Sequence, residues 1–247
     1  MNIWAIADLH LCFGVPNKTM EIFGTDWKNY IEKIKNNWLE KITADDLVLI
    51  AGDISWGKNL AEARPDFLFL NALPGIKIII KGNHDYWWTT QSKLKNFLPS
   101  SIHFIHNNVF NFRNISIAGT RLWDSKEYDF SKYIRYVKNP KTSKAPKPID
   151  NEKIFLREIE RLKLSLSHLD KNAKIKIAMC HYPPISATLE DSIISKILEK
   201  HHIDICVFGH LHHVHKSMKI FGKKNNIKYL LTSSDYLDFM PLKIWTD

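Results

Sequence analysis

The residues best suited to chemistry form five short polar segments that are far apart in the sequence. Each segment contains aspartate, asparagine or histidine, and each follows an apolar run of the length of a β-strand. The segments are Asp8-Leu9-His10, Gly52-Asp53, Gly82-Asn83-His84-Asp85, His181 and Gly209-His210-Leu211-His212. Because the loops at the C-terminal edge of an α/β sheet converge on one ligand site, we expect these side chains to be neighbours in space.

The residue types in these segments fit two adjacent divalent metal ions. Asp53 has two carboxylate oxygens, so it can bridge two ions and offset part of their mutual repulsion. The seven candidate ligands are Asp8, His10, Asp53, Asn83, His181, His210 and His212. Mixed carboxylate, amide and imidazole donors suit Mn, Fe, Zn or Ni rather than a structural zinc held by thiolates. We expect Mn²⁺, with Fe, Zn and Ni as the alternatives.

Two simpler interpretations compete with this one. Each polar residue could be no more than a cap at the end of a strand, although their joint spacing favours the metal site. Cys12, two residues after His10, could contribute a thiolate. Oxygen and imidazole ligands are already sufficient, however, so we expect no metal role for Cys12.

The five segments, in this order, resemble the motifs of the calcineurin-like metallophosphoesterases, and the match runs from position 8 to 212. The Tyr86-Trp87-Trp88 sequence is most similar to the bacterial predicted phosphohydrolase branch. The resemblance implies that one metal is held by Asp8, His10, Asp53 and His212. It implies that the other is held by Asp53, Asn83, His181 and His210, with Asp53 as the bridge.

The resemblance also implies a mechanism in which a hydroxide that bridges the metals attacks phosphorus in line. His84 would act as the general acid for the leaving group, with Asp85 orienting it. A role as helix N-cap explains Asp85 equally well. Asn83 and His84 would face the substrate. Arg121 could pair with a substrate phosphate, or it could be an ordinary surface arginine.

The elements that must position these residues alternate between strands and helices. Apolar runs predict strands at 3–7, 47–51, 76–80, 175–179 and 203–208, and i+3/i+4 periodicity predicts helices within 31–42 and 155–169. Short runs at 102–106, 109–112 and 115–118 favour an antiparallel meander, and 216–221 with 227–232 favour a hairpin. We therefore predict an α/β fold, a two-layer mixed β-sheet sandwich flanked by helices.

Two long segments interrupt this alternation. Residues 11–27 contain several aromatic side chains, and residues 121–152 are rich in lysine, proline and tyrosine. We interpret the chain as a single domain, 1–247, in which both segments are insertions on the substrate side. A linker between two halves is the alternative for the second segment.

The bulk properties suit a soluble, cytoplasmic protein of 247 residues. The sequence shows neither a signal peptide nor an apolar run long enough to cross a membrane, and its three cysteines do not suggest a disulfide framework. The formal charge of +9 is compatible with anionic partners, but A/T-rich codon usage, which enriches lysine, is the preferred explanation.

We therefore predict a metal-dependent phosphohydrolase that cleaves a phosphodiester or phosphomonoester, with a phosphorylated small molecule as its substrate. A nuclease, with nucleic acid as the partner, is a second hypothesis that the positive charge keeps open. A non-catalytic metal-binding scaffold on the same fold is a third. Turnover of a phosphoester in the presence of Mn²⁺ would separate the enzymes from the scaffold.

Overall fold

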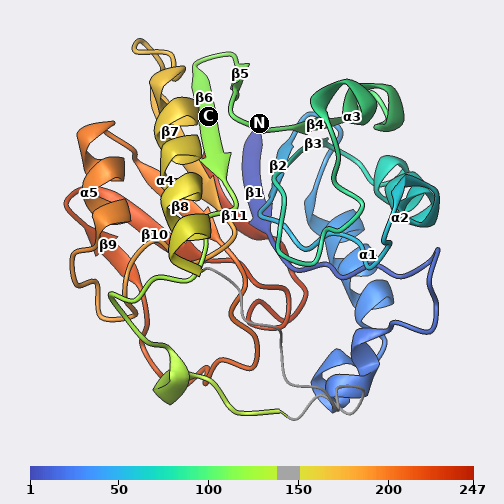
Figure 1. Ribbon diagram of the computed structural model, residues 1–247. Coiled ribbons are helices and arrows are strands. Elements are labelled where there is room, and N and C mark those ends of the chain that lie inside the picture. Colours follow the sequence, from blue (N-terminus) through green and yellow to red (C-terminus); the bar gives the residue numbers. More distant parts are fainter. Residues whose placement is uncertain (138–150) are drawn as a thin grey trace.

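Two β-sheets lie face to face between two layers of helices in the computed structural model, which describes residues 1–137 and 151–247. Helices α1, α2 and α3 cover one sheet, and α4 and α5 cover the other (Figure 1). Both sheets are mixed. This arrangement confirms the predicted fold class.

The first sheet has the strand order β11-β1-β2-β3-β4. Strands β1 to β4 are parallel, and only β11 runs antiparallel to its neighbour. The bounds are β1 Asn2–Ile6, β2 Leu47–Ile50, β3 Ile76–Ile79, β4 Ile102–Phe104 and β11 Leu242–Thr246. The strands predicted near residues 3, 47 and 76 are confirmed.

The second sheet has the strand order β5-β6-β7-β8-β10-β9. Its four central strands are parallel, and antiparallel strands form both edges. The bounds are β5 Val109–Phe112, β6 Ile115–Thr120, β7 Ile175–Cys180, β8 Ile205–Phe208, β9 Gly222–Lys224 and β10 Ile227–Leu231. The strands predicted near residues 175 and 203 are confirmed.

The helices form because each carries an apolar face that packs on a sheet. Their bounds are α1 Tyr30–Lys41, α2 Leu60–Ala72, α3 Gln91–Phe97, α4 Asn151–Ser167 and α5 Ile193–Lys200. Within the described residues there are also three short 3₁₀ helices: η1 Met20–Phe23, η2 Thr25–Trp27 and η3 Ser131–Tyr133. Helices α1 and α4 confirm the two predicted from periodicity. No helix in the described part of the chain combines the length and the apolar composition of a membrane span.

Both faces of the central strands are buried, which explains why their sequences read as continuous apolar runs. In β1, Ile3 and Ala5 belong to the core between the two sheets. Trp4 and Ile6 point the other way, into the core shared with α1 and α2. The strands are therefore fixed on both sides, and the loops that leave their C-terminal ends start from rigid positions.

The two sheets are joined directly at this C-terminal edge. The backbone N–H of Ala7 donates to the Thr232 carbonyl at 2.7 Å, and the Ser234 N–H donates to the Ala7 carbonyl at 3.0 Å. This short parallel bridge ties the end of β1 to the end of β10. It brings loops from both sheets to one place, which is where the chemistry-bearing segments begin.

Two sequence predictions need correction. The meander is wrong for its first run, because β4 pairs in parallel with β3 in the first sheet, while only β5 and β6 form an antiparallel pair. The chain crosses between sheets at Asn107, whose positive φ of 66° supports the sharp turn.

The hairpin predicted from 216–221 and 227–232 exists, but its first strand lies later in the chain. That strand is β9, which starts directly after the predicted run 216–221. The two-residue turn of the hairpin is Asn225-Asn226, and both residues have positive φ as a type I′ turn requires.

Lys77 is a buried charge in the middle of β3. It is fully buried, and its Nζ donates to the Leu73 carbonyl. Burial lowers the pKa of Lys77 to about 8 from its ordinary value of 10.5. The unfolded chain therefore holds this proton more tightly, and protonation of Lys77 disfavours the folded state.

We expect Lys77→Met to increase the free energy of unfolding by about 1–2 kcal/mol at pH 7, because a methionine of similar length removes a buried charge. The gain is largest below about pH 8 and shrinks between about pH 8 and pH 10.5, as the folded wild-type protein loses the proton first. Urea unfolding at several pH values measures it, with the exposed Lys93→Met as the control. If the increase in the free energy of unfolding did not change with pH, the buried charge of Lys77 could not be its cause.

Candidate metal centre

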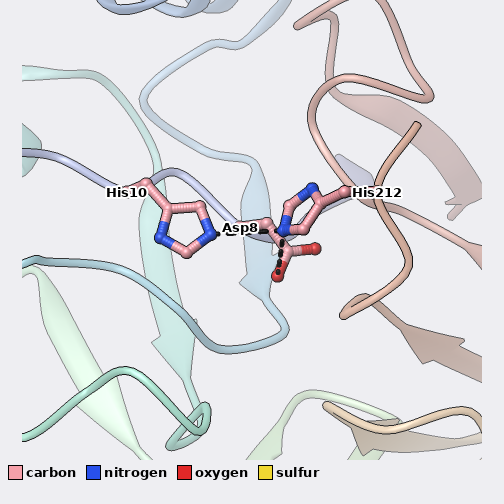
Figure 2. Close-up of side chains that lie close together, drawn as sticks. All are labelled: Asp8, His10 and His212. Carbon is pink, nitrogen blue, oxygen red and sulfur yellow. Dashed lines mark hydrogen bonds and ion pairs between the residues drawn. The ribbon is translucent and has the colours of Figure 1, made fainter. Parts of the chain in front are cut away.

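The predicted residues of the first and last segments meet at the C-terminal edge of the sheets. Figure 2 shows His10 and His212 approaching each other from opposite sides, with Asp8 beside His212. The Nε2 atoms of the two imidazoles lie 3.3 Å apart, and Nε2 of His212 lies 3.9 Å from Oδ1 of Asp8. Asp8 and His10 follow β1, whereas His212 follows β8. The ligand atoms of this trio all lie within 4.8 Å of one another.

A second group forms beside the first from segments that follow β3, β7 and β8. Oδ1 of Asn83 lies 2.6 Å from Nε2 of His181 and 3.0 Å from Nδ1 of His210. His181 is fully buried, and the ring of His210 lies against Tyr182 with 3.9 Å between the ring centroids. The structure thus brings together three further residues that the sequence predicted as ligands.

Asp53 lies between the two groups. Its Oδ2 is 3.7 Å from Nε2 of His10 in the first group and 3.5 Å from Nε2 of His181 in the second. Asp8, Asp53 and His181 also place their ligand atoms within 4.8 Å of one another. All seven predicted ligands therefore lie in one contiguous cluster, and Asp53 occupies the position expected of a bridge.

The backbone of this cluster is strained in a consistent way. Asp8, His10, Asp53 and His210 have positive φ values of 58°, 45°, 51° and 73°. Non-glycine residues rarely adopt this conformation, and each instance costs about 1–3 kcal/mol. Such strain is retained where the surrounding structure dictates the side-chain position. Here it turns the side chains toward one centre.

Close backbone approach explains two of the glycines. A Cβ atom at Gly82 would lie 2.1 Å from Oδ1 of Asp53, and one at Gly209 would lie 2.5 Å from Oδ2 of Asp8. Both distances are impossible for a real side chain. Glycine at these positions therefore lets the loops pack directly against the carboxylates of the cluster.

The donor chemistry of the cluster fits divalent cations. Nδ1 of His181 lies 2.9 Å from the Ala51 carbonyl oxygen, which can only accept, so Nδ1 carries the proton. Nε2 of the neutral ring then has a lone pair, and it faces Oδ1 of Asn83 and the carboxylate of Asp53. Lone pairs that converge in this way, with the opposite ring nitrogen fixed by a carbonyl, are the arrangement typical of metal-ligating histidines.

Asp235 is a residue of this site that the sequence analysis missed. Its Oδ1 accepts from Nδ1 of His212 at 2.9 Å, and its Oδ2 accepts from the backbone N–H of His213 at 2.7 Å. The carboxylate fixes the His212 ring so that Nε2 points at the cluster. The available signal was its position, because Asp235 follows β10 at the same sheet edge as the other segments.

We expect Asp235→Ala to weaken Mn²⁺ binding by about 10–100-fold, because His212 loses the carboxylate that orients it and increases its basicity. Calorimetric titration of the chelator-treated protein with Mn²⁺ measures the change. Asp238→Ala is the matched control, since Asp238 is 83% exposed and pairs with Lys216 at the surface. Equal Mn²⁺ affinities in both variants would show that Asp235 does not support metal binding.

Burial dominates the electrostatics of the cluster. It raises the pKa of Asp8 to about 7 and lowers the pKa of His181 to about 3. Burial also acts to lower the pKa of His212, but the carboxylates of Asp235, Asp8 and Asp53 outweigh it and raise that pKa to about 9. Burial from water destabilises the charged form of these carboxylates. Bound divalent cations would supply the positive charge that stabilises it.

His84 lies beside the cluster without joining it. Its backbone N–H donates to Oδ1 of Asp53 at 2.8 Å, which anchors the residue. Its ring lies 4.8 Å from the ring of Trp56 and 5.8 Å from that of His10, measured between centroids. Within the described part of the chain the imidazole makes no hydrogen bond, so both ring nitrogens are available to a ligand. Burial lowers the pKa of His84, and the charge of Asp53 opposes this shift.

Asp85 does not make the predicted contact with His84. Its buried carboxylate instead accepts from the backbone N–H groups of Gly82, Asp53 and Ile54 at 2.7, 2.9 and 2.9 Å, and from Nε1 of Trp87 at 2.9 Å. The reason is geometric, because the turn after β3 directs this side chain back toward the loop after β2. Asp85 thus holds the backbone on both sides of the bridge position.

The structure also places the two remaining residues that the sequence brought into question, Arg121 and Cys12. Arg121 is not an ordinary surface arginine, because its side chain is only 13% exposed, lies 3.3 Å from Oε1 of Glu158 and stacks over Trp123. Cys12 is buried, and its Sγ lies 3.6 Å from the hydroxyl of Tyr30. It belongs to neither of the groups of residues that could hold a metal.

The two predicted insertions contact each other beside the cluster. Arg135 pairs with Asp26 at 2.7 Å, and its backbone N–H donates to the carbonyl of His213, directly after the last ligand. Next to this contact lies a cavity of about 710 Å³, whose lining includes Lys33, Arg135, His213 and Asp235. Residues 138–150 of the predicted insertion 121–152 lie outside the described residues.

Comparison with known proteins gives one family and several similar folds. A family model described as calcineurin-like phosphoesterase matches residues 1–214. The Gene 66 protein of Mycobacterium phage D29 is 33% identical over 84 residues, which are 34% of this chain and 40% of that protein. The chain thus covers less than half the length of that relative.

Two solved structures are similar in fold. Phosphopantetheinyl hydrolase from Mycobacterium tuberculosis has a TM-score of 0.55 at 13% identity, covering 100% of this chain and 96% of that one. A purple acid phosphatase from seeds of yellow lupin (Lupinus luteus) has a TM-score of 0.49 at 12% identity, covering 94% and 43%. At these identities the similarity concerns the fold alone.

Proposed function

The chain belongs to the calcineurin-like phosphoesterase family, and on that premise we propose that it is a phosphohydrolase dependent on two divalent metal ions. Its substrate is a phosphodiester or phosphomonoester of a small molecule. The observation that carries the proposal is the position of Asp53, whose carboxylate lies between two groups of oxygen and nitrogen donors. A single bridge between two ligand groups is what a dinuclear phosphoesterase requires.

The proposed division of the ligands is the one that the family resemblance implies. Asp8, His10 and His212 would hold one ion together with Asp53, and Asn83, His181 and His210 would hold the other together with Asp53. When bound, the ions would supply an activated water and positive charge for the phosphoryl oxygens. Mn²⁺ is the ion that we propose, because oxygen and imidazole donors are mixed here and no thiolate takes part. We also propose that the protein acts in the cytoplasm.

The remaining chemistry comes from side chains that bind no metal. His84 is anchored through its backbone to Asp53, and its ring is unpaired beside the ligands, which suits a general acid that protonates the leaving-group oxygen. Asp85 acts as a positioning residue, since its carboxylate holds the backbone N–H groups of Gly82 and Asp53. Trp56 covers one face of the His10 ring and excludes water from that side.

The substrate would lie between the metal centre and the two insertions. We propose that the whole chain is one domain and that residues 11–27 and 121–152 form substrate-side walls. The ion pair between Asp26 and Arg135 supports this, because it joins the two insertions beside the cavity of about 710 Å³. Asp235 lines that cavity and also contacts His212, so the cavity lies beside the metal centre.

A substrate screen of the Mn²⁺-loaded protein tests the function. The panel contains bis-p-nitrophenyl phosphate, p-nitrophenyl phosphate and cyclic nucleotides, and Asp53→Asn serves as the blank. We expect Mn²⁺-dependent hydrolysis of at least one ester by the wild-type protein only. Two bound ions without turnover of any ester would instead support a metal-binding scaffold.

A further inference from the structure

A second pocket, strongly basic, lies next to the metal centre on the side of the second ligand group. It has a volume of about 300 Å³ and is enclosed by α4 and by the loops that follow β3, β4 and β6. Its charged lining residues are Lys81, Arg121, Arg157, Arg161 and Glu158. Four cationic side chains therefore face a single carboxylate. We refer to these five residues as the basic pocket.

Glu158 organises the basic pocket without neutralising it. The residue is 1% exposed, and its Oε1 accepts from Arg161 at 2.7 Å and from Arg121 at 3.3 Å. Its Oε2 accepts from the hydroxyl of Thr120 at 2.8 Å. One buried carboxylate thus fixes two guanidinium groups in place, and a net positive charge remains at this site.

Several donors in the basic pocket have no protein acceptor. Nε of Arg121 is buried and lacks a hydrogen-bond partner among the described residues. The ammonium of Lys81 likewise makes no hydrogen bond or ion pair with any residue that the structure describes. A buried donor without a partner, such as Nε of Arg121, is costly, so this arrangement is suited to an anionic ligand.

The basic pocket and the metal centre share two loops. Lys81 directly precedes Gly82-Asn83, which supplies one candidate ligand. The carbonyl of Arg121 accepts from the backbone N–H groups of His181 and Tyr182 at 3.1 and 2.9 Å. The cations of the pocket are therefore fixed to the same backbone that positions Asn83 and His181.

We propose that the basic pocket binds a second anionic group of the substrate, of the phosphate class, while the phosphoryl group to be cleaved lies at the metal centre. This inference rests on the proposed function. Guanidinium groups bind phosphate oxygens through paired, charge-assisted hydrogen bonds, and a cavity of about 300 Å³ admits one phosphate group and its neighbouring atoms. The preferred substrate therefore carries two anionic groups.

The first test measures binding of pyrophosphate to the full chain by calorimetry, in the presence of a chelator so that no metal contributes. We expect binding to the wild-type protein, and dissociation constants raised about tenfold or more in Lys81→Gln and Arg161→Gln, because each loses charge-assisted hydrogen bonds. Lys163→Gln is the control, since Lys163 lies on α4 outside the pocket and is half exposed. Circular dichroism checks that each variant is folded. If pyrophosphate did not bind, or bound equally to all four proteins, the proposal that the basic pocket binds a phosphate-class anion would be wrong.

The second test separates a substrate group from a free anion. Hydrolysis of bis-p-nitrophenyl phosphate by the Mn²⁺-loaded protein is inhibited with adenosine 5′-monophosphate or adenosine 3′,5′-bisphosphate. We expect the bisphosphate to inhibit about tenfold more strongly, and this ratio to fall toward one in Arg161→Gln and Lys81→Gln but not in Lys163→Gln. A ratio that is the same in all proteins would show a free-anion site and overturn the substrate assignment. Absence of hydrolysis in the substrate screen would overturn the proposed function and with it the substrate assignment. Anion binding by the basic pocket is judged separately by the calorimetric test, which needs neither metal nor turnover.

Discussion

Asp53→Asn is expected to lower kcat/KM for bis-p-nitrophenyl phosphate by about 10³-fold or more. The carboxylate lies 3.7 Å from Nε2 of His10 and 3.5 Å from Nε2 of His181, so it is the single group that both ligand sets share. Asparagine keeps the shape and the oxygen that accepts from the His84 N–H. It removes the negative charge that holds two cations close together, and with it most of the electrostatic stabilisation of the transition state.

Metal content and activity should fall together in this variant. Elemental analysis after Mn²⁺ loading and desalting should show fewer ions per chain than in the wild-type protein. Asp45→Asn is the matched control, because Asp45 is exposed in the loop that precedes β2. Full activity and full metal content in Asp53→Asn would show that the cluster does not need a bridge, and the two-metal interpretation would be wrong.

His84→Ala is expected to lower the rate by about 10²–10⁴-fold while both metal ions stay bound. The imidazole lies beside the ligands without contacting them through a hydrogen bond, and its backbone anchor to Asp53 survives the substitution. The loss should be largest for an ester with a poor leaving group, such as a phenyl phosphate, because its oxygen needs the proton most. It should be smaller for p-nitrophenyl esters. Steady-state kinetics on both kinds of ester measure the difference.

The exposed His103 on β4 provides the control for His84. His103→Ala changes the same residue type away from the cluster and should leave kinetics and metal content as in the wild-type protein. Equal losses by His84→Ala for good and poor leaving groups would indicate a role in binding rather than in proton transfer. Loss of metal ions from the His84→Ala protein would indicate that His84 is a metal ligand rather than a general acid.

The sequence was sufficient to predict the positions of the ligands because strand ends are encoded locally. Apolar runs identify β1, β2, β3, β7 and β8, and the first polar residues after each run must leave the sheet at its C-terminal edge. Asp8, Asp53 and His181 are positioned by this rule alone. Their convergence then follows from the parallel pairing of the strands and from the bridge between Ala7 and the end of β10.

The residues that act through other residues could not be predicted in the same way. Asp235 reaches His212 across a gap of 23 positions, and Asp85 turns away from its neighbour His84 toward the backbone of Asp53. The position of Asp235 after β10 indicates the sheet edge at which it lies, but the partners of both side chains depend on the packing of one loop against another. The same reason explains Arg121, whose pairing with Glu158 on α4 determines where its guanidinium lies.

The strand pairing that the sequence misassigned also depends on long-range packing. The run at β4 has the length and composition of a meander strand, but its inward side chains complete the core on the free edge of β3. Local turn residues cannot distinguish a hairpin from a crossing between two stacked sheets, since asparagine suits both. This crossing forms one wall of the basic pocket.

The number of Mn²⁺ ions bound per chain, measured by elemental analysis on active and desalted wild-type protein, tests the dinuclear site most directly. We expect two ions per chain, and hydrolysis that disappears when a chelator removes them and returns when Mn²⁺ is restored. Full activity with one ion per chain, or with none, would contradict a site built from two ligand groups around Asp53.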